Sequence, residues 1–252
     1  MLLLKSLLFA LGMWSSIVVF AILCLFTFPL PFSVRYGFLS QWARLNLWWL
    51  ELTCGVRYQI EGRENIPEGN AIVMSKHQST WETLALQVIF PPQVWVMKRE
   101  LLKVPFFGWG LAMLEPIAID RKARGKARQQ LIDQGTQRLK NGRWVVIFPE
   151  GTRIPPGKKG RYALGGASLA HSSGYPVVPM AHNAGEFWSR RKFIKQPGTI
   201  QVRIGPVIES KDKSIEEINK EVEGWIEGQM AEITFKDERG QSSSDAADSR
   251  LG

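Results

Sequence analysis

Six short apolar runs, separated by stretches with helical patterning, constrain the fold of this chain more than any other feature. A strand with one solvent-exposed face alternates apolar and polar residues. These runs lack that alternation, so each is expected to be a strand covered on both faces. The runs occupy residues 71–75, 94–97, 117–119, 144–148, 177–181 and 199–204. Helices are predicted at residues 80–89, 122–140 and 165–171. The alternation predicts an α/β fold with helices flanking a largely buried sheet.

Further signals mark the two ends of this domain. Val56, Tyr58 and Ile60 alternate with polar residues, which predicts another strand. Ser214 and Glu217 have the spacing of a capping box and precede an apolar helical face, so a last helix is expected there. Beyond residue 235 the chain is polar and is expected to be disordered. We divide the chain into a membrane-associated segment, an α/β domain and a tail, at residues 1–55, 56–235 and 236–252.

The first segment is apolar enough to enter a membrane. Residues 6–28 are interrupted only by small or hydroxylated side chains, and roughly 20 apolar residues cover the core of a bilayer. A cleaved signal peptide is the competing interpretation. Lys5 is its single positive residue, however, and no small-residue cleavage site follows the long apolar run. We expect the segment to be retained as a membrane helix.

A second stretch, residues 41–50, concentrates tryptophan, whose ring favours the interface between headgroups and acyl chains. The alternative is an amphipathic helix whose buried face is formed by residues at helical spacing, namely Trp42, Leu45, Trp49 and Leu52. A helix pair that lies within one leaflet satisfies both interpretations, and whether the pair crosses the bilayer stays open.

The net charge indicates the class of partner, and the cysteines and remaining histidines show no functional spacing. The chain has 32 Lys and Arg against 23 Asp and Glu, a formal charge of +9, which favours anionic partners such as an acidic membrane or nucleic acid. Cys24 and Cys54 lack metal-ligand spacing, and we interpret both as packing residues. His171 and His182 lack acidic partners at useful spacing and are interpreted as structural. No metal site is predicted.

A histidine and a carboxylate, His77 and Glu82, follow the first apolar run. Histidine has an unperturbed pKa near neutrality, so a carboxylate that fixes its tautomer can make it a general base toward a hydroxyl. Ser79 and Glu82 also have capping-box spacing, in which case Glu82 caps a helix and nothing more. Within one helix the pair would lie about 140° apart, so contact requires a turn before the helix.

Cations follow several of the predicted strands, where open α/β sheets bind ligands. Residues 148–153 read FPEGTR, in which Gly151 permits close backbone approach and Arg153 offers a fork of donors suited to phosphate. Arg121 and Lys98 also follow strands. A solvated basic surface is the alternative for each of them.

In this order, the turn with His77 and Glu82 and the blocks at 117–121, 148–153 and 177–180 resemble the four motifs of the glycerolipid acyltransferases. The pattern is most similar to the 1-acylglycerol-3-phosphate, or lysophosphatidic acid, acyltransferases. The resemblance covers residues 56–206 and implies a mixed sheet flanked by helices, with an N-terminal membrane-docking helix pair at residues 1–55. The family pattern usually has aspartate where this chain has Glu82, which puts the histidine–carboxylate contact in question.

The resemblance implies a mechanism and a set of site residues. His77 deprotonates the sn-2 hydroxyl of the lysolipid, Glu82 orients His77, and the alkoxide attacks an acyl thioester without forming an acyl-enzyme. The phosphate would be held or its pocket shaped by Lys98, Arg121, Glu150, Gly151, Thr152 and Arg153, and Pro179 would form a wall on the acyl side. The co-substrate would be acyl-CoA or an acyl carrier protein thioester, and no cofactor is expected.

The expected location is the inner membrane, with the catalytic domain on its cytoplasmic face and anionic lipid as a partner. Residues 187–193, which are aromatic and basic, are a further docking candidate. One alternative is an acyltransferase for another lysolipid. A hydrolase is disfavoured because no Gly-x-Ser-x-Gly elbow occurs. Another is a noncatalytic module that binds anionic lipid or nucleic acid through the basic residues at 122–128.

Overall fold

The computed structural model of the protein describes residues 1–120 and 124–233. Within these residues seven strands form one sheet in the order β1-β7-β6-β2-β5-β3-β4. Their bounds are β1 Val56–Glu61, β2 Ile72–Ser75, β3 Gln93–Lys98, β4 Ile117–Ile119, β5 Trp144–Ile147, β6 Val177–His182 and β7 Gly198–Ile204.

The sheet is mixed, as expected. Strands β6, β2, β5, β3 and β4 run parallel to their neighbours. Strand β7 is antiparallel to β6 and parallel to β1. The five mutually parallel strands therefore end at one edge of the sheet. Loops that follow β2, β3, β4 and β5 converge there, although they are far apart in the sequence.

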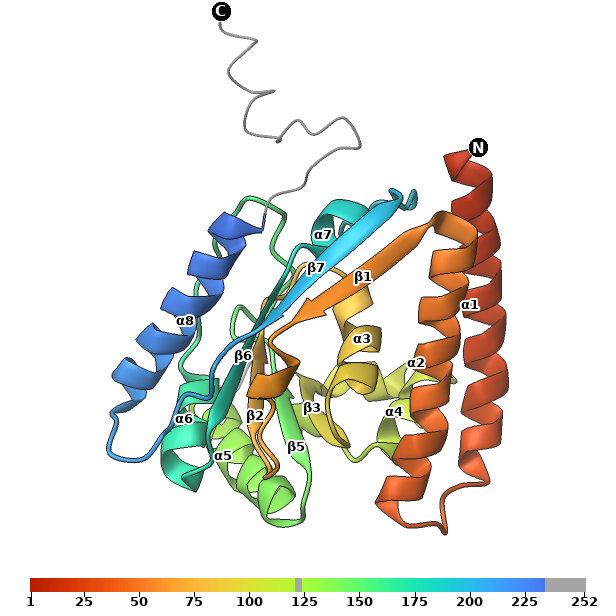
Figure 1. The fold of residues 1–252 in the computed structure, drawn as a ribbon. Coiled ribbons are helices and arrows are strands. Elements are labelled where there is room, and N and C mark those ends of the chain that lie inside the picture. Colours follow the sequence, from red (N-terminus) through yellow and green to blue (C-terminus); the bar gives the residue numbers. More distant parts are fainter. Residues whose placement is uncertain (121–123, 234–252) are drawn as a thin grey trace, which may run out of the picture.

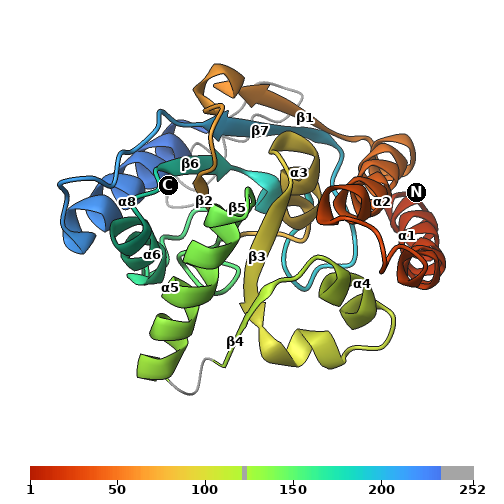
Figure 2. The ribbon, with the colours of Figure 1, turned by 90° about the horizontal axis from the view of Figure 1, so that it is seen from below.

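Helices cover both faces of the sheet (Figure 2). Helices α5 (Arg124–Lys140), α6 (Gly165–Ser173) and α8 (Ile215–Glu232) lie on one face. On the other face lie α3 (Trp81–Ile89) and α2 (Phe32–Cys54), and α1 (Leu2–Leu25) lies outside α2. The remaining short elements are η1 (Arg63–Asn65), η2 (Arg99–Lys103), α4 (Phe107–Met113) and α7 (Ala184–Phe187).

Every predicted strand is present, and its ends shift by at most one residue. The predicted helices correspond to α3, α5 and α6, although residues 121–123 lie outside the described part of the chain. The structure adds η2 and α4, which the sequence pattern did not predict. Helix α4 has only seven residues, two of them glycines, and such a short segment carries little periodicity to detect.

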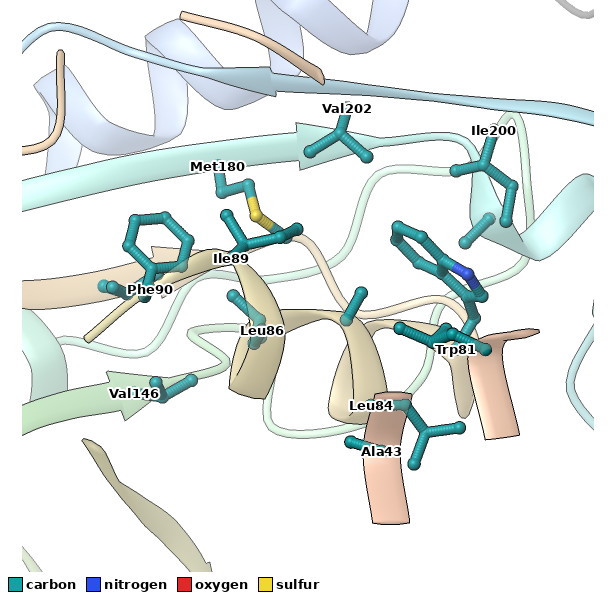
Figure 3. Close-up of a cluster of buried hydrophobic side chains, with 14 of the residues drawn as sticks. Ala43, Trp81, Leu84, Leu86, Ile89, Phe90, Val146, Met180, Ile200 and Val202 are labelled. Atoms are coloured by element: carbon teal, nitrogen blue, oxygen red, sulfur yellow. The ribbon is translucent and has the colours of Figure 1, made fainter. Parts of the chain in front are cut away.

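Helix α3 is the centre of one hydrophobic core (Figure 3). It places Trp81, Leu84 and Leu86, all nearly fully buried, between the sheet and α2. Met180 of β6 and Val202 of β7 contribute to the same cluster from the sheet side. Because α3 is packed between the sheet and α2, its first turn, which carries Glu82, and the preceding turn, which carries His77, are held in place.

The N-terminal helices α1 and α2 form an antiparallel pair beside the α/β domain (Figure 1). Helix α1 has a mean hydropathy of 2.4 over its most apolar 18 residues, of which only 22% are buried. By length and composition α1 is the one helix of the described residues that could cross a membrane. Its exposed apolar side chains include Leu4, Leu11, Trp14 and Val19.

The buried face of α2 agrees with the predicted one in part. Trp42 and Trp49 are partly buried and pack against the core, but Leu45 and Leu52 are exposed. Leu39, Ala43 and Leu50 are buried in addition. The spacing alone could not define the whole buried face because apolar residues surround the whole helix. Trp48, which is 56% exposed, points away from the domain, as a residue at a lipid interface would.

The predicted boundary between residues 55 and 56 falls where α2 ends at Gly55 and β1 begins. The helix pair nevertheless shares a hydrophobic core with the sheet, because Phe9 and Leu47 belong to the cluster around α3. Cys24 and Cys54 are buried free thiols, so their interpretation as packing residues is confirmed. The predicted tail lies outside the described residues.

The predicted capping box of the last helix is confirmed. The Ser214 hydroxyl accepts a hydrogen bond from the Glu217 amide, and the Glu217 carboxylate accepts one from the Ser214 amide. Helix α8 buries Ile218, Val222 and Ile226 against the sheet. It therefore closes the hydrophobic core on the face of the sheet opposite to α3.

Gly62, which ends β1, allows a prediction about stability. Its φ is +82°, and a Cβ there would lie 2.1 Å from the Ile204 carbonyl oxygen of β7. We expect Gly62→Ala to destabilise the protein by about 2–4 kcal/mol, because strain and a backbone clash add. Gly142→Ala is the matched control, since its φ is +79° but a Cβ would contact nothing within 4 Å. Urea unfolding in detergent should show a loss of about 1 kcal/mol for the control, and equal losses in the two variants would contradict the clash.

Candidate active site

His77 lies in the turn between β2 and α3, with its ring facing a carboxylate. His77 Nδ1 is 2.8 Å from Glu82 Oε1. Glu82 Oε1 also accepts hydrogen bonds from the amides of Gln78 and Ser79, at 3.0 and 2.8 Å. Glu82 therefore contacts the histidine and also holds the backbone amides of the turn before α3. The predicted capping box is only half formed, because the Ser79 hydroxyl accepts from the Trp81 amide and no side chain caps the helix at Thr80.

Electrostatics keep the Glu82 carboxyl ionised. The side chain is fully buried, and burial would raise its pKa. The hydrogen bond from His77, the nearby rings of His182 and His77 and the Ser79 amide outweigh burial and hold the pKa of Glu82 below its usual value. An ionised carboxylate accepts hydrogen bonds only, so it requires a proton on His77 Nδ1. His77 Nε2 then carries the free lone pair of a base.

The ring of His77 is fixed on its flat side as well. It stacks on Phe148, with ring centroids 4.0 Å apart and an interplanar angle of 15°. His77 Nε2 has no hydrogen-bond partner among the described residues. The side chain is 15% exposed. The Phe148 ring and the Glu82 carboxylate therefore hold the histidine, and its Nε2 is open to a ligand.

His182, interpreted as structural, is buried behind Glu82. Its Nε2 donates to the Lys76 carbonyl at 2.9 Å, and its Nδ1 accepts from the Ala184 amide at 3.2 Å. These two bonds define a neutral ring. Burial lowers the pKa of His182, although the Glu82 charge opposes that effect. His182 therefore lies behind the His77–Glu82 pair, called the dyad below, and is in a position to support it.

A cavity of about 800 Å³ opens beside His77. Five of the predicted site residues line it, namely His77, Lys98, Gly151, Thr152 and Arg153. They come from the end of β3 and from the loops after β2 and β5, as the edge of a parallel sheet predicts. The rest of the lining is mostly apolar and comes from both sides of the sheet, including Phe20, Leu84 and Leu111 on one side and Leu131 and Ile147 on the other.

The cations of this cavity lack acidic partners. Lys98 and Arg153 form no ion pair within the described part of the chain. Burial lowers the pKa of Arg153; the Glu82 charge opposes this shift, and the positive charge of Arg190 adds to it. A guanidinium still remains protonated at any physiological pH. Two cations without ion-pair partners, in the same cavity as His77, create a site that suits an anionic group.

Arg190 was not among the predicted site residues, although it lies within the docking candidate at residues 187–193. It lines the cavity and donates to Thr152 Oγ1 at 3.3 Å and to the Arg153 carbonyl at 3.0 Å. The signal that could have found it is its position after β6, at the same edge of the sheet as the other loops. It brings a third cation to the site.

Two predicted residues occupy other positions. Glu150 does not line the cavity; it is buried behind it, where Oε2 accepts the His77 amide at 3.0 Å and Oε1 accepts Lys76 Nζ at 2.7 Å. Pro179 is buried in β6, and a Cβ at Gly205 would meet its ring. It does not line the cavity, which corrects its assignment to the acyl-side wall. Arg121 lies outside the described residues.

Comparison with known proteins identifies the family. A family model described as Acyltransferase matches residues 57–183, which include every described residue of the dyad and of the 148–153 turn. The 1-acyl-sn-glycerol-3-phosphate acyltransferase of Pseudomonas aeruginosa is 48% identical over 91% of this chain and 91% of its own length. The chain belongs to the acyltransferase family.

A more distant relative and a solved structure also match this acyltransferase. The 1-acyl-sn-glycerol-3-phosphate acyltransferase of Saccharomyces cerevisiae is 30% identical over 72% of this chain and 62% of its own length. The crystal structure of the 1-acyl-sn-glycerophosphate (LPA) acyltransferase from Thermotoga maritima matches with a TM-score of 0.76 at 26% identity, and the match covers 91% of this chain and 95% of that one. This likeness extends over the N-terminal helices as well as the sheet.

Proposed function

We propose that this acyltransferase moves a fatty acyl chain from a thioester to the free sn-2 hydroxyl of 1-acylglycerol-3-phosphate, which gives phosphatidic acid. The observation that carries the proposal is one cavity lined by the open nitrogen of His77 and by three cations, Lys98, Arg153 and Arg190. The base suits a hydroxyl, and the cations suit a phosphate. The names of its relatives support the same acceptor.

The reaction follows from the dyad. His77 Nε2 removes the proton of the lysolipid hydroxyl while Glu82 stabilises the imidazolium through Nδ1. The hydroxyl oxygen attacks the thioester carbonyl, the tetrahedral intermediate collapses, the C–S bond breaks, and the thiolate takes the proton from His77. No acyl-enzyme forms. A base of this kind contributes about 10²–10⁴-fold, and positioning of the two substrates contributes much of the rest.

The donor is proposed to be acyl-CoA or an acyl carrier protein thioester. The mostly apolar lining of the 800 Å³ cavity supports a fatty acyl chain as the transferred group. Both donors present the same thioester, so the chemistry at His77 is identical for either.

We place the enzyme at the inner membrane with its catalytic domain on the cytoplasmic face. The exposed apolar surface of α1 and the exposed tryptophans Trp14 and Trp48 support a lipid environment. Phe193 and Ile194, 46% and 38% exposed, add apolar surface beside the basic residues at 190–192. Each basic residue near an anionic bilayer adds about 1 kcal/mol of attraction. The cavity includes Met13 and Phe20 of α1, so a lysolipid has a short path from the membrane to His77.

Arg153→Ala tests the phosphate assignment. We expect the KM for 1-acylglycerol-3-phosphate to rise about 10- to 100-fold, because a charge-assisted hydrogen bond contributes about 1.5–3 kcal/mol. The KM for the thioester should stay within about twofold of the wild-type value, since this side chain faces the acceptor. Arg57→Ala is the control, because the Arg57 side chain is 72% exposed and pairs with Glu51 on the surface. If the two variants show the same acceptor KM, the assignment is wrong.

An acyltransferase for a lysolipid with a larger headgroup is the second candidate. The same base and cations serve it, because every lysophospholipid carries a phosphate. The departure at Glu82, where the family pattern usually has aspartate, is the observation that favours considering another acceptor. Acceptor competition in vesicles between lysophosphatidic acid and lysophosphatidylcholine separates the two proposals.

A further inference from the structure

Lys76, next to the catalytic histidine, is a buried ammonium with two carboxylate partners. Its side chain is 1% exposed. Lys76 Nζ lies 2.7 Å from Glu150 Oε1 and 2.7 Å from Glu227 Oε1. Glu227 belongs to α8, which packs on the opposite face of the sheet from α3. None of these three residues lines the cavity.

The Lys76 cluster is tied to His77 through the backbone. The second oxygen of Glu150 accepts the His77 amide at 3.0 Å. The His77 carbonyl accepts the amide of Ile154 at 2.8 Å, so the turn at 148–154 holds both backbone groups of the histidine. Because Glu150 belongs to that turn and also binds the His77 amide, one ammonium fixes the position of the base relative to Thr152 and Arg153.

Glu227 completes the cluster from the far side. Its Oε1 accepts the Tyr162 hydroxyl at 2.8 Å as well as Lys76 Nζ. A carboxylate oriented by two donors has little freedom to turn. Without it, Lys76 would be held from one side by Glu150 and by the Lys158 carbonyl at 3.5 Å. Buried ion pairs are often no more stabilising than apolar side chains, so stability alone does not account for this arrangement.

We propose that Lys76 and Glu227 are positioning residues, through which α8 sets the placement of His77 against the phosphate-binding turn. The proposal rests on the proposed function for its kinetic consequence. Loss of the Glu227 carboxylate lets Lys76 and then Glu150 move, and the His77 amide loses its fixed acceptor. A shift of the base by a fraction of an ångström slows proton transfer but leaves both substrate sites in place.

Glu227→Ala is the test, with Glu223→Ala as the matched control. Glu223 lies one turn earlier on α8, where it pairs with the exposed Lys159 at 2.6 Å. We expect kcat of Glu227→Ala to fall about tenfold with both KM values within twofold, while Glu223→Ala keeps the wild-type kcat. Glu227→Gln, which retains an acceptor oxygen for Lys76 and Tyr162, should recover most of the rate.

Hydrogen exchange at the His77 amide gives a readout that needs no activity. We expect faster exchange in Glu227→Ala than in wild type, and wild-type exchange in Glu223→Ala.

Tyr162→Phe removes only the hydroxyl that orients Glu227. It should shift both readouts in the same direction by a smaller amount, and it replaces the alanine variant if that one does not fold. Wild-type kcat, or wild-type exchange at His77, in the folded Glu227 or Tyr162 variant would overturn the positioning role. Failure of the wild-type protein to acylate any lysolipid would instead overturn the proposed function, and the exchange comparison would still decide the positioning role.

Discussion

Replacing His77 with alanine is expected to reduce acyl transfer by about 10²–10⁴-fold while the fold persists. His77 is the proposed base, and its Nε2 has no other partner among the described residues. The loss should appear in kcat, because the cations that hold the acceptor are untouched. Initial rates of phosphatidic acid formation by the purified variant, in vesicles, measure it.

His171→Ala is the control for a histidine substitution. His171 is an exposed residue of α6, its Nδ1 lies 2.9 Å from the Lys213 carbonyl oxygen, and it does not line the cavity. It should retain the wild-type rate. Near-native transfer by His77→Ala, with a wild-type unfolding curve, would show that another group removes the proton.

Glu82→Gln is expected to have the second-largest effect, a loss of about 10²–10⁴-fold in kcat. Glu82 accepts three hydrogen bonds through Oε1 and a fourth through Oε2, and a glutamine must replace one acceptor with an NH₂ donor. Because Oε1 accepts hydrogen bonds from both His77 Nδ1 and the two backbone amides, an amide oxygen at that position keeps all three donors, but the neutral side chain no longer stabilises the imidazolium that forms during proton transfer. An NH₂ group at that position would instead face His77 Nδ1 and force the proton to Nε2. The base then has no lone pair toward the substrate, as in serine proteases whose orienting aspartate is changed to asparagine.

Glu82→Asp separates charge from reach. Aspartate keeps the charge but is one methylene shorter, so it cannot hold both the Ser79 amide and His77 Nδ1 without movement of the turn. We expect a rate between those of wild type and Glu82→Gln, measured with the same acceptor and thioester. A Glu82→Gln variant with wild-type kcat would contradict the orienting role of the carboxylate, whatever the aspartate variant does.

Most of the sheet and part of the site could be predicted from the sequence. The strands were visible because residues buried on both faces leave uninterrupted apolar runs. Given parallel strands, the loops after them must meet at one edge, so Lys98, Arg153 and His77 could be placed together without a structure. Arg190 obeys the same rule, but its aromatic neighbours suggested a membrane contact instead.

Side chains that act from behind the cavity could not be assigned in this way. Glu150 lies in the same motif as Arg153, and nothing in the letters FPEGTR shows that one side chain points into the cavity and the other toward Lys76. Pro179 lies in a predicted strand, but the strand pattern does not show which of its two faces borders the cavity. The partner of Lys76 is on α8, 151 positions away, where no local pattern relates the two residues. Such contacts depend on the packing of elements distant in the sequence.

The central claim is that the protein uses His77 and the cations of one cavity to acylate a phosphate-bearing lysolipid. Acceptor choice by the purified protein is the most direct test of this claim. The protein is placed in anionic vesicles with acyl-CoA or an acyl carrier protein thioester. The acceptor is either 1-acylglycerol-3-phosphate or the same monoacylglycerol without its phosphate. We expect phosphatidic acid to form, with kcat/KM at least about tenfold higher for the phosphorylated acceptor, since charge-assisted hydrogen bonds to the phosphate are lost with the other. Equal rates with the two acceptors, or thioester cleavage without an acylated lipid, would contradict it.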